Sequence, residues 1–201
     1  MLVIKEIEDL INTLKSLPNI TSKQAEKIVY YLLNSDDDFV SSLINNIKDL
    51  RKNLQFCNQC NTISLTPICQ ICSNKARNQN QLCIVATSND VDKIEATNSY
   101  SGLYFVLHQE ISVKSKTPLN QNLTSKLLNL INKKDIKEII IATNWTPDGE
   151  ATAIFLKELI KHRIGNKVNI FRLAVGLPIN SALNYADNET LTHALKNKTQ
   201  Y

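Results

Sequence analysis

Apolar side chains recur at helical spacing in the first part of the chain, where residues 3 to 16 predict one helix. Pro18 interrupts the pattern, and a second helix is expected to begin at Thr21 or Ser22, because either hydroxyl can cap it. A third helix is expected after the acidic run 35–38, which favours a helix N-terminus. The apolar stripes of the first and third helices are Ile4, Ile7, Leu10, Ile11, Leu14 and Leu17, and Phe39, Leu43, Ile47, Leu50 and Leu54.

The hydrophobic period changes in the second half of the chain, where short apolar runs predict strands that are buried on both faces. These runs are residues 82–86, 103–107, 139–142 and, with a weaker pattern, 168–171. Helical patterns lie between them at roughly 123–132 and 148–162. Strands that alternate with helices indicate an α/β domain with a mostly parallel, helix-covered sheet. Residues 108–122 show no periodicity and predict a long loop, which in a compact domain is often functional.

Four cysteines separate the two patterns, as the pairs Cys57/Cys60 and Cys69/Cys72. Each CxxC pair can place two thiolates on one metal ion, and four thiolates complete the tetrahedron of a structural Zn²⁺ site. Such a closed set leaves no position for water, so catalysis at the metal is not expected. Disulfide pairing is the alternative, which an intracellular chain disfavours. Cys83 lies outside this spacing in an apolar run and is expected to be a small buried hydrophobic residue.

The composition is that of a folded globular protein, with 43% hydrophobic and 21% charged residues in a chain of 201. No apolar run reaches the roughly 18 residues that a membrane span requires. Acidic residues occupy the place where a secretory signal would have a basic region, so we expect a cytoplasmic protein. A net charge of +4 permits binding to nucleic acid but does not by itself establish it.

With helices, a four-cysteine module and an α/β domain in this order, the chain resembles RecR, the bacterial recombination-mediator family. The resemblance rests on residues 17–25 (LPNITSKQA), the cysteine module with Arg77, residues 82–107, and the motifs IATN (141–144), DGEAT (148–152), RLAVGLP (172–178) and YADNETL (185–191). It implies a helical helix-hairpin-helix DNA-binding segment (1–54), a four-cysteine zinc finger (55–77), a Rossmann-like Toprim domain (78–171) and a C-terminal Walker-B-like oligomerisation segment with a helix (172–201).

The resemblance also implies a function. Proteins of this family are non-enzymatic DNA-binding mediators of recombinational repair that act with RecO and, in many bacteria, with RecF. They help to load the strand-exchange recombinase on single-stranded DNA that is coated by single-strand-binding protein. They form homo-oligomers, commonly tetrameric rings that clamp DNA. A member of the family is therefore expected in the cytoplasm, associated with the nucleoid.

The hairpin between the first two helices is the expected DNA contact, and Lys23 and Lys27 match the family's basic positions there. At i and i+4 they share one helix face, where cations can meet phosphates, although a solvated lysine face is the alternative. Two glycines of the family's hairpin are replaced by Asn19 and Thr21. Asparagine tolerates left-handed backbone, whereas threonine is expected to fit the turn less easily.

The acidic residues that Toprim enzymes use are only partly present in this sequence. Ala86 occupies the end of the first strand, where the enzymes of this class need a glutamate for proton transfer. Asp148 and Glu150 remain and can hold a weakly bound cation, or can serve only the dipole of a helix capped by Thr146 with Pro147 at its first position. The GxxxxGK[ST] motif of nucleotide hydrolysis is absent from the sequence.

Two further functions remain open on the sequence. One is a protein-interaction adaptor with weakened DNA binding, which the lost hairpin glycines favour. The other is a Toprim nuclease or primase-like enzyme, which Ala86 disfavours. Lys114 and Lys116 lie where the family has a glycine-rich turn, and they either bind DNA or a partner or are simply solvated.

Overall fold

The computed structural model describes residues 4–177, 180 and 182–198. Contacts divide the chain into two compact units, Met1–Leu54 and Gln55–Tyr201. Val3 of the first predicted helix, Pro178 of the RLAVGLP motif, and part of the segment 172–201 lie outside the described residues. None of the described helices is long and apolar enough to cross a membrane.

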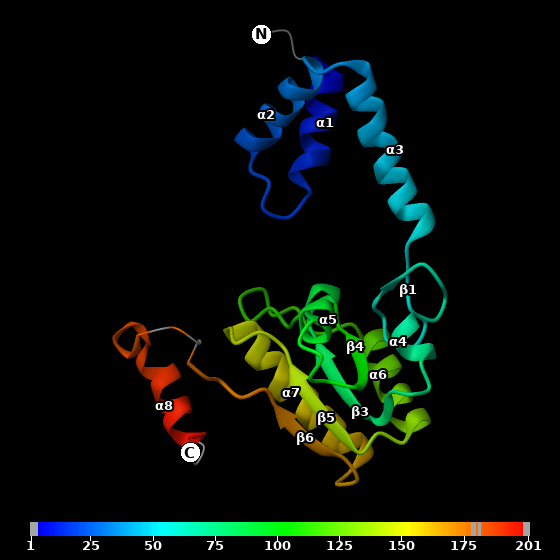
Figure 1. Cartoon of the computed structure of the whole chain (residues 1–201). Helices are drawn as coiled ribbons and strands as arrows, with labels where there is room; N and C mark the ends of the chain where they lie inside the picture. The colour runs from blue at the N-terminus through cyan, green and yellow to red at the C-terminus, as the bar shows by residue number, and fades with distance from the viewer. Residues whose placement is uncertain (1–3, 178–179, 181, 199–201) are drawn as a thin grey trace. The chain divides into compact units, whose positions relative to one another are not determined.

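The first unit is helical, as predicted, with α1 (Lys5–Lys15), α2 (Ser22–Leu33) and α3 (Asp37–Asn53) (Figure 1). Asp36 caps α3, because its carboxylate accepts a hydrogen bond from the backbone N–H of Phe39 at 2.6 Å. The unit has a small core in which Ala25 and Val29 are fully buried. Most of the apolar stripe of α3 remains exposed.

The hairpin between α1 and α2 corrects one expectation about its replaced glycines. Asn19 adopts the left-handed conformation at φ 62°, as an asparagine at such a position can. The expected difficulty with Thr21 was wrong, because Thr21 has extended backbone (φ −80°, ψ 160°) and forms the N-cap of α2. Its hydroxyl accepts from the backbone N–H of Gln24 at 3.3 Å, and the Gln24 side chain accepts from the N–H of Thr21 at 2.8 Å.

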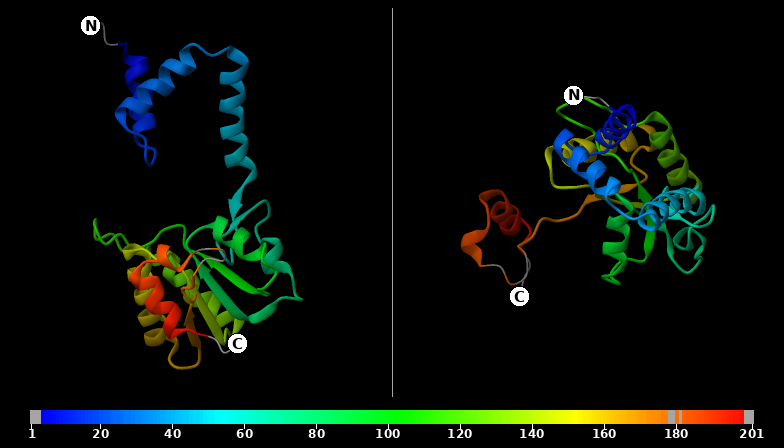
Figure 2. Two further views of the ribbon diagram at one scale, coloured as in Figure 1. Left: turned by 60° about the vertical axis from the view of Figure 1, so that its left-hand side comes forward. Right: turned by 90° about the horizontal axis from the view of Figure 1, so that it is seen from above.

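A four-stranded parallel sheet forms the centre of the second unit (Figures 1 and 2). Its strands are β3 (Asn78–Val85), β4 (Gly102–Val106), β5 (Glu138–Ala142) and β6 (Asn169–Arg172), in the spatial order β4-β3-β5-β6. The predicted α/β class with a parallel sheet is confirmed. The sheet sets the carboxyl ends of its strands along one edge, where loops of parallel α/β domains commonly bind ligands.

Helices cover both faces of this sheet. Alternate strand residues point to opposite sides, so each strand contributes apolar side chains to both helix layers. Leu82 and Ile84 pack with α6 (Gln121–Lys134) and α7 (Pro147–Ile164), while Cys83 and Val85 pack with α5 (Ser88–Glu95). Cys83 is 2% exposed, as predicted, and burial raises the pKa of its thiol to about 12. The short helix α5 had no periodic signal long enough to predict it.

The start of α7 combines several local signals. Thr146 caps it by accepting a hydrogen bond from Gly149 N–H at 3.1 Å, and Pro147 occupies the first turn. A Cβ atom on Gly149 would overlap the carbonyl oxygen of Asn144, so only glycine permits this close approach. The first turn of α7, with Asp148 and Glu150, therefore lies directly against the loop that leaves β5.

The C-terminal part of the second unit contains a 3₁₀ turn, η1 (Leu183–Tyr185), and the helix α8 (Asn188–Lys196). Asp187 caps α8 through its carboxylate, which accepts from the backbone N–H of Thr190 at 2.8 Å and from the Thr190 hydroxyl at 2.7 Å. The YADNETL motif thus contains the N-cap and the first turn of α8. The predicted division of the chain into four parts stays a prediction.

Candidate metal centre and nucleic-acid interface

The four cysteines come together in a small module built from a two-stranded hairpin and one helical turn. The hairpin consists of β1 (Gln55–Phe56) and β2 (Ile63–Ser64), and the turn is α4 (Gln70–Ser73). The Sγ atoms of Cys57, Cys60, Cys69 and Cys72 all lie within 4.8 Å of one another, and all four residues are buried. The cluster can hold a metal ion.

The donor set fits a tetrahedral ion. Four sulfurs at the Zn–S distance of about 2.3 Å would lie about 3.8 Å apart, and the Sγ atoms of Cys60 and Cys69 are 3.5 Å apart. Hydrogen bonds to its neighbours, with burial, raise the pKa of Cys60 far above the usual thiol value, while contact with Cys60 lowers the pKa of Cys69. Four sulfurs this close cannot all be thiolates without a cation, so a divalent ion would replace shared protons.

The cysteine module is attached to the edge of the sheet through the first knuckle. The backbone N–H of Val106, at the end of β4, donates to the carbonyl of Cys60 at 2.8 Å, and the Asn61 side chain donates back to Val106 at 3.0 Å. On the other side, the Ser88 hydroxyl accepts from the N–H of Ile63 at 3.2 Å. Nε2 of His108 lies 2.6 Å from the Asn61 carbonyl. These bonds place the four-cysteine cluster beside the carboxyl end of β4.

A second attachment runs through Arg77, which follows the module. Its guanidinium donates to both carboxylate oxygens of Glu95, at 2.8 and 2.7 Å, and to the carbonyl of Gly102 at 2.8 Å. The Tyr104 hydroxyl donates to the same carboxylate at 2.7 Å, and the guanidinium lies 5.7 Å from the Tyr104 ring centroid. The hydrogen bonds of Arg77 hold the pKa of Glu95 below its usual range. The sequence pointed to Arg77 only through the family resemblance, and no local signal connected it with Glu95.

The two predicted DNA-binding residues lie on the first turns of α2. Lys23 and Lys27 are both exposed, and neither forms an ion pair within the described part of the chain. Their ammonium groups are available to an external anion. Their role in DNA binding stays a prediction at this point.

Asp148 is engaged by the long loop that follows β4. Its carboxylate accepts a hydrogen bond from the backbone N–H of Val113 at 2.9 Å. One helical turn later, the buried Thr152 hydroxyl accepts from the N–H of Ile111 at 2.8 Å. The carboxylate therefore acts as an anchor for this loop, and the sequence offered no signal for that contact.

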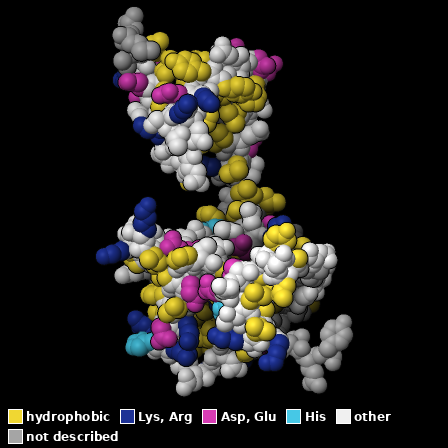
Figure 3. Space-filling model, turned by 90° about the vertical axis from the view of Figure 1, so that its left-hand side faces the viewer, with side chains coloured by type: hydrophobic (Ala, Val, Ile, Leu, Met, Phe, Trp, Pro, Cys, Tyr) yellow, Lys and Arg dark blue, Asp and Glu magenta, His cyan; other side chains and the backbone are white. Residues whose placement is uncertain are grey.

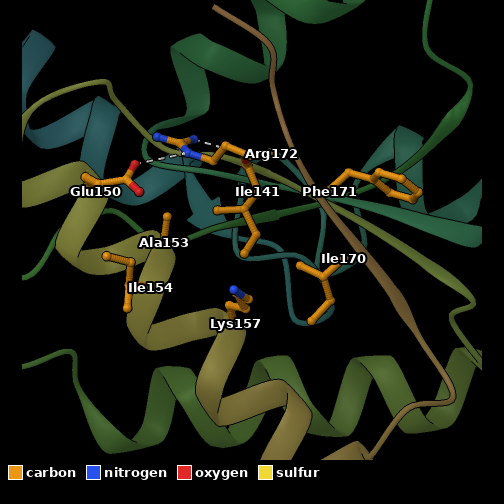
Figure 4. A pocket seen from close by; sticks show the side chains of 8 residues that line it. All are labelled: Ile141, Glu150, Ala153, Ile154, Lys157, Ile170, Phe171 and Arg172. Carbon is orange, nitrogen blue, oxygen red and sulfur yellow. Dashed lines mark hydrogen bonds and ion pairs between the residues drawn. The ribbon is translucent and has the colours of Figure 1, made fainter. Parts of the chain in front are cut away.

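Glu150 lies on the wall of a cavity of about 260 Å³ between α7 and the end of β6 (Figure 4). Its carboxylate is 3.5 Å from Nε of Arg172. The guanidinium of Arg172 also donates to the carbonyls of Ile141 at 3.0 Å and Thr143 at 2.8 Å, and it lies 4.4 Å from the Trp145 ring centroid. Asp148 and Glu150 thus contact different protein groups. A cation shared between them stays a prediction.

Comparison with known proteins assigns most of the second unit. The family model of the Toprim domain matches residues 80–174, and that of the RecR C-terminal region matches residues 176–199. Proteins named recombination protein RecR are similar over nearly the whole chain. The one from Ureaplasma urealyticum is 35% identical over 193 residues, covering 96% of this chain and 95% of its own. That from Ligilactobacillus salivarius is 35% identical and covers 96% of both chains, and that from Streptococcus mutans is 35% identical over the full length of both.

The full-length similarity agrees with the residues that carried the resemblance and with the order of hairpin, four-cysteine cluster and Toprim fold found in the structure. The chain belongs to the RecR family of recombination proteins.

Proposed function

We propose that this protein is a non-enzymatic DNA-binding mediator of recombinational repair. It acts with RecO, and with RecF where RecF is present, to load the recombinase on single-stranded DNA. It works as a homo-oligomeric, tetrameric ring that clamps DNA at the nucleoid in the cytoplasm. The observation that carries the proposal is the similarity to recombination proteins RecR along the full chain. A structural Zn²⁺ on Cys57, Cys60, Cys69 and Cys72 is part of the proposal.

The carboxyl edge of the Toprim sheet supports the proposal that this protein is not an enzyme. Ala86 follows the last residue of β3 and is 4% exposed, so a methyl group stands where a catalytic carboxylate would transfer a proton. Asp148 is held by Val113 and Glu150 lies beside Arg172. A nuclease or primase-like enzyme would need a different proton-transfer group.

The hairpin supports contact with DNA. Asn19 supplies the left-handed backbone of the turn and Thr21 completes a capping box, so the turn forms without glycines at these two positions. A formed turn favours DNA contact over an adaptor in which DNA binding has weakened. Lys23 and Lys27 then present two cations on one helix face.

Replacing both Lys23 and Lys27 with alanine is expected to weaken DNA binding and its salt dependence together. If each lysine neutralises one phosphate of a single strand, the slope of log K against log salt concentration should fall by about 1.4. Fluorescence anisotropy of a labelled single-stranded oligonucleotide, titrated at several salt concentrations, measures this slope.

The matched control is Lys48→Ala with Lys52→Ala, an exposed i, i+4 pair on α3 that removes the same charge. The control should bind almost as the wild type does. Wild-type protein without any salt-sensitive DNA binding, alone or with RecO, would contradict the proposed function.

The exposed apolar surface of the helical unit supports self-association (Figure 3). A groove of about 470 Å³ is lined by apolar side chains from all three helices, among them Leu10, Leu32, Leu43 and Ile44. A unit this small cannot close its own core, and a contiguous apolar patch of this kind marks an interface. We take a second copy of the chain as its occupant, because the proposed ring requires contacts between copies.

Ile44→Glu is expected to lower the oligomer mass, because a carboxylate would be buried in the groove without a partner. Light scattering coupled to size-exclusion chromatography measures the mass. Asn46→Glu places the same charge on an exposed position of α3 that does not line the groove, and it should leave the mass unchanged. A wild-type protein that stays monomeric at high concentration would contradict the ring.

A further inference from the structure

The loop between β4 and α6 has a defined structure, although its sequence shows no periodicity. Ser112 and Thr117 form an antiparallel bridge, in which each backbone N–H donates to the other residue's carbonyl, at 3.1 and 3.2 Å. Within the turn, the N–H of Ser115 donates to the Ser112 hydroxyl at 3.2 Å, and the Ser115 and Thr117 hydroxyls are 2.8 Å apart. Residues 112–117 therefore form a small closed hairpin, here called the lysine hairpin.

The lysine hairpin is fastened to the first two turns of α7. The N–H groups of Ile111 and Val113 donate to Thr152 and Asp148, at 2.8 and 2.9 Å. On the C-terminal side, Leu119 is buried in the main core. The chain is thus fixed on both sides of the turn, and this anchoring restricts the freedom of the residues at its tip.

The tip of the lysine hairpin carries two exposed cations. Lys114 and Lys116 are exposed and separated by one residue, and Lys116 has left-handed backbone at φ 54°. Neither lysine forms an ion pair with any residue that the structure describes. The acidic residue nearest in the chain is engaged elsewhere, since the Glu110 carboxylate accepts from the backbone and side chain of Asn144 at 3.0 and 3.1 Å.

The position of the lysine hairpin also favours a ligand. In the strand order β4-β3-β5-β6, the connection that leaves β3 runs to β4, and the connection that leaves β5 runs the opposite way to β6, so the sheet has a switch point between β3 and β5. Ligands of open parallel sheets bind outside the carboxyl ends of the strands at such a point. The lysine hairpin follows β4, one neighbour of β3, and is held by α7, which follows β5.

We propose that Lys114 and Lys116 form a second phosphate-binding site of this protein, which grips the backbone of single-stranded DNA. The inference rests on the proposed function, because it assumes that the chain binds DNA through α2 as well. Asp148 and Thr152 hold the hairpin in place, so that less conformational entropy is lost when the lysines meet phosphates. The contact reads no sequence, since phosphate binding fixes position and affinity only.

The test compares three double variants of the full chain in salt titrations with a labelled single-stranded oligonucleotide. Lys114→Ala with Lys116→Ala should lower the slope of log K against log salt concentration by about 1.4, as for two lost phosphate contacts. Lys114→Arg with Lys116→Arg should restore the wild-type slope, because arginine keeps the charge. Lys161→Ala with Lys167→Ala removes two exposed lysines near the opposite end of α7 and should leave the slope within experimental error.

The outcomes separate this inference from the proposed function. If the Lys23/Lys27 variant loses affinity while the Lys114/Lys116 variant binds as the wild type, the second site is refuted and the proposed function stands. An equal loss in the Lys161/Lys167 control would refute it too, since net charge alone would then explain the effect. If the wild type shows no salt-sensitive DNA binding, both the second site and the proposed function are refuted. Loss of binding to RecO without loss of DNA binding would assign the lysine hairpin to an acidic protein surface and overturn the proposal.

Discussion

Replacement of Cys72 by serine is expected to abolish metal binding and to unfold the cysteine module. The hydrophobic cluster of this module consists only of the four cysteines and the half-buried Ile71, so little apolar burial remains without the ion. Structural zinc contributes about 10–16 kcal/mol to the folding of comparable zinc-finger peptides. A serine hydroxyl stays protonated at neutral pH and cannot replace a thiolate in this set.

Metal content by elemental mass spectrometry, together with limited proteolysis across residues 55–77, tests this expectation. The matched control is Cys83→Ala, which removes a buried thiol outside the cluster and should leave one metal ion per chain. If the Cys72→Ser protein kept a full equivalent of metal and the wild-type cleavage pattern, the proposed zinc site would be wrong. If the wild type bound a full equivalent of a different metal, only the identity of the proposed ion would change, not the site.

Arg77→Ala is expected to lower the free energy of unfolding of the second unit by about 2–4 kcal/mol. Breaking a buried ion pair costs about 3–5 kcal/mol, and the figure is reduced here because the Glu95 side chain is 32% exposed. The substitution leaves the Gly102 carbonyl without the guanidinium donor and Glu95 with only the Tyr104 hydroxyl. Urea denaturation, with the m-value checked for constancy, measures the change.

The pH dependence gives the same prediction a second readout. Because Arg77 holds the pKa of Glu95 below its usual value, the pair stabilises the folded state above the unfolded glutamate pKa of about 4.3. That contribution is lost as the pH falls through the folded-state pKa, so the cost of Arg77→Ala should be smaller at low pH than at neutral pH. Lys137→Ala is the control, since its pair with Asp135 is exposed and contributes less than about 1 kcal/mol. Equal losses of unfolding free energy in the two variants would show that the Arg77–Glu95 pair does not stabilise this unit.

The two attachments of the cysteine module explain why these variants have large effects. Val106 and Asn61 join the module to the end of β4, and Arg77 joins its C-terminal side to α5 through Glu95. The four-cysteine cluster is therefore connected to the edge of the sheet from which the lysine hairpin also departs. A disturbance at the cluster is expected to reach the carboxyl end of β4 before any other strand.

Local features of the structure followed from the sequence because their causes are local. Apolar residues at a period of 3.6 predicted α1, α2 and α3, and continuous apolar runs predicted the buried strands β3, β4 and β5. The hydroxyl of Thr146 before Pro147 predicted the start of α7. The short helix α5 was missed because eight residues hold too few turns for a periodic signal.

The sequence by itself thus determined the helical and strand segments, the metal-binding potential of the paired cysteines and, through the stretches that resemble RecR proteins, the family. Only the tertiary structure decided what the charged residues contact. Asp148 anchors a backbone N–H 35 residues away, Asn61 reaches Val106 across 45 residues, and Arg77 meets Glu95 on a different element. Such contacts leave no periodic or spacing signal, because they depend on which loops the parallel sheet brings to one edge.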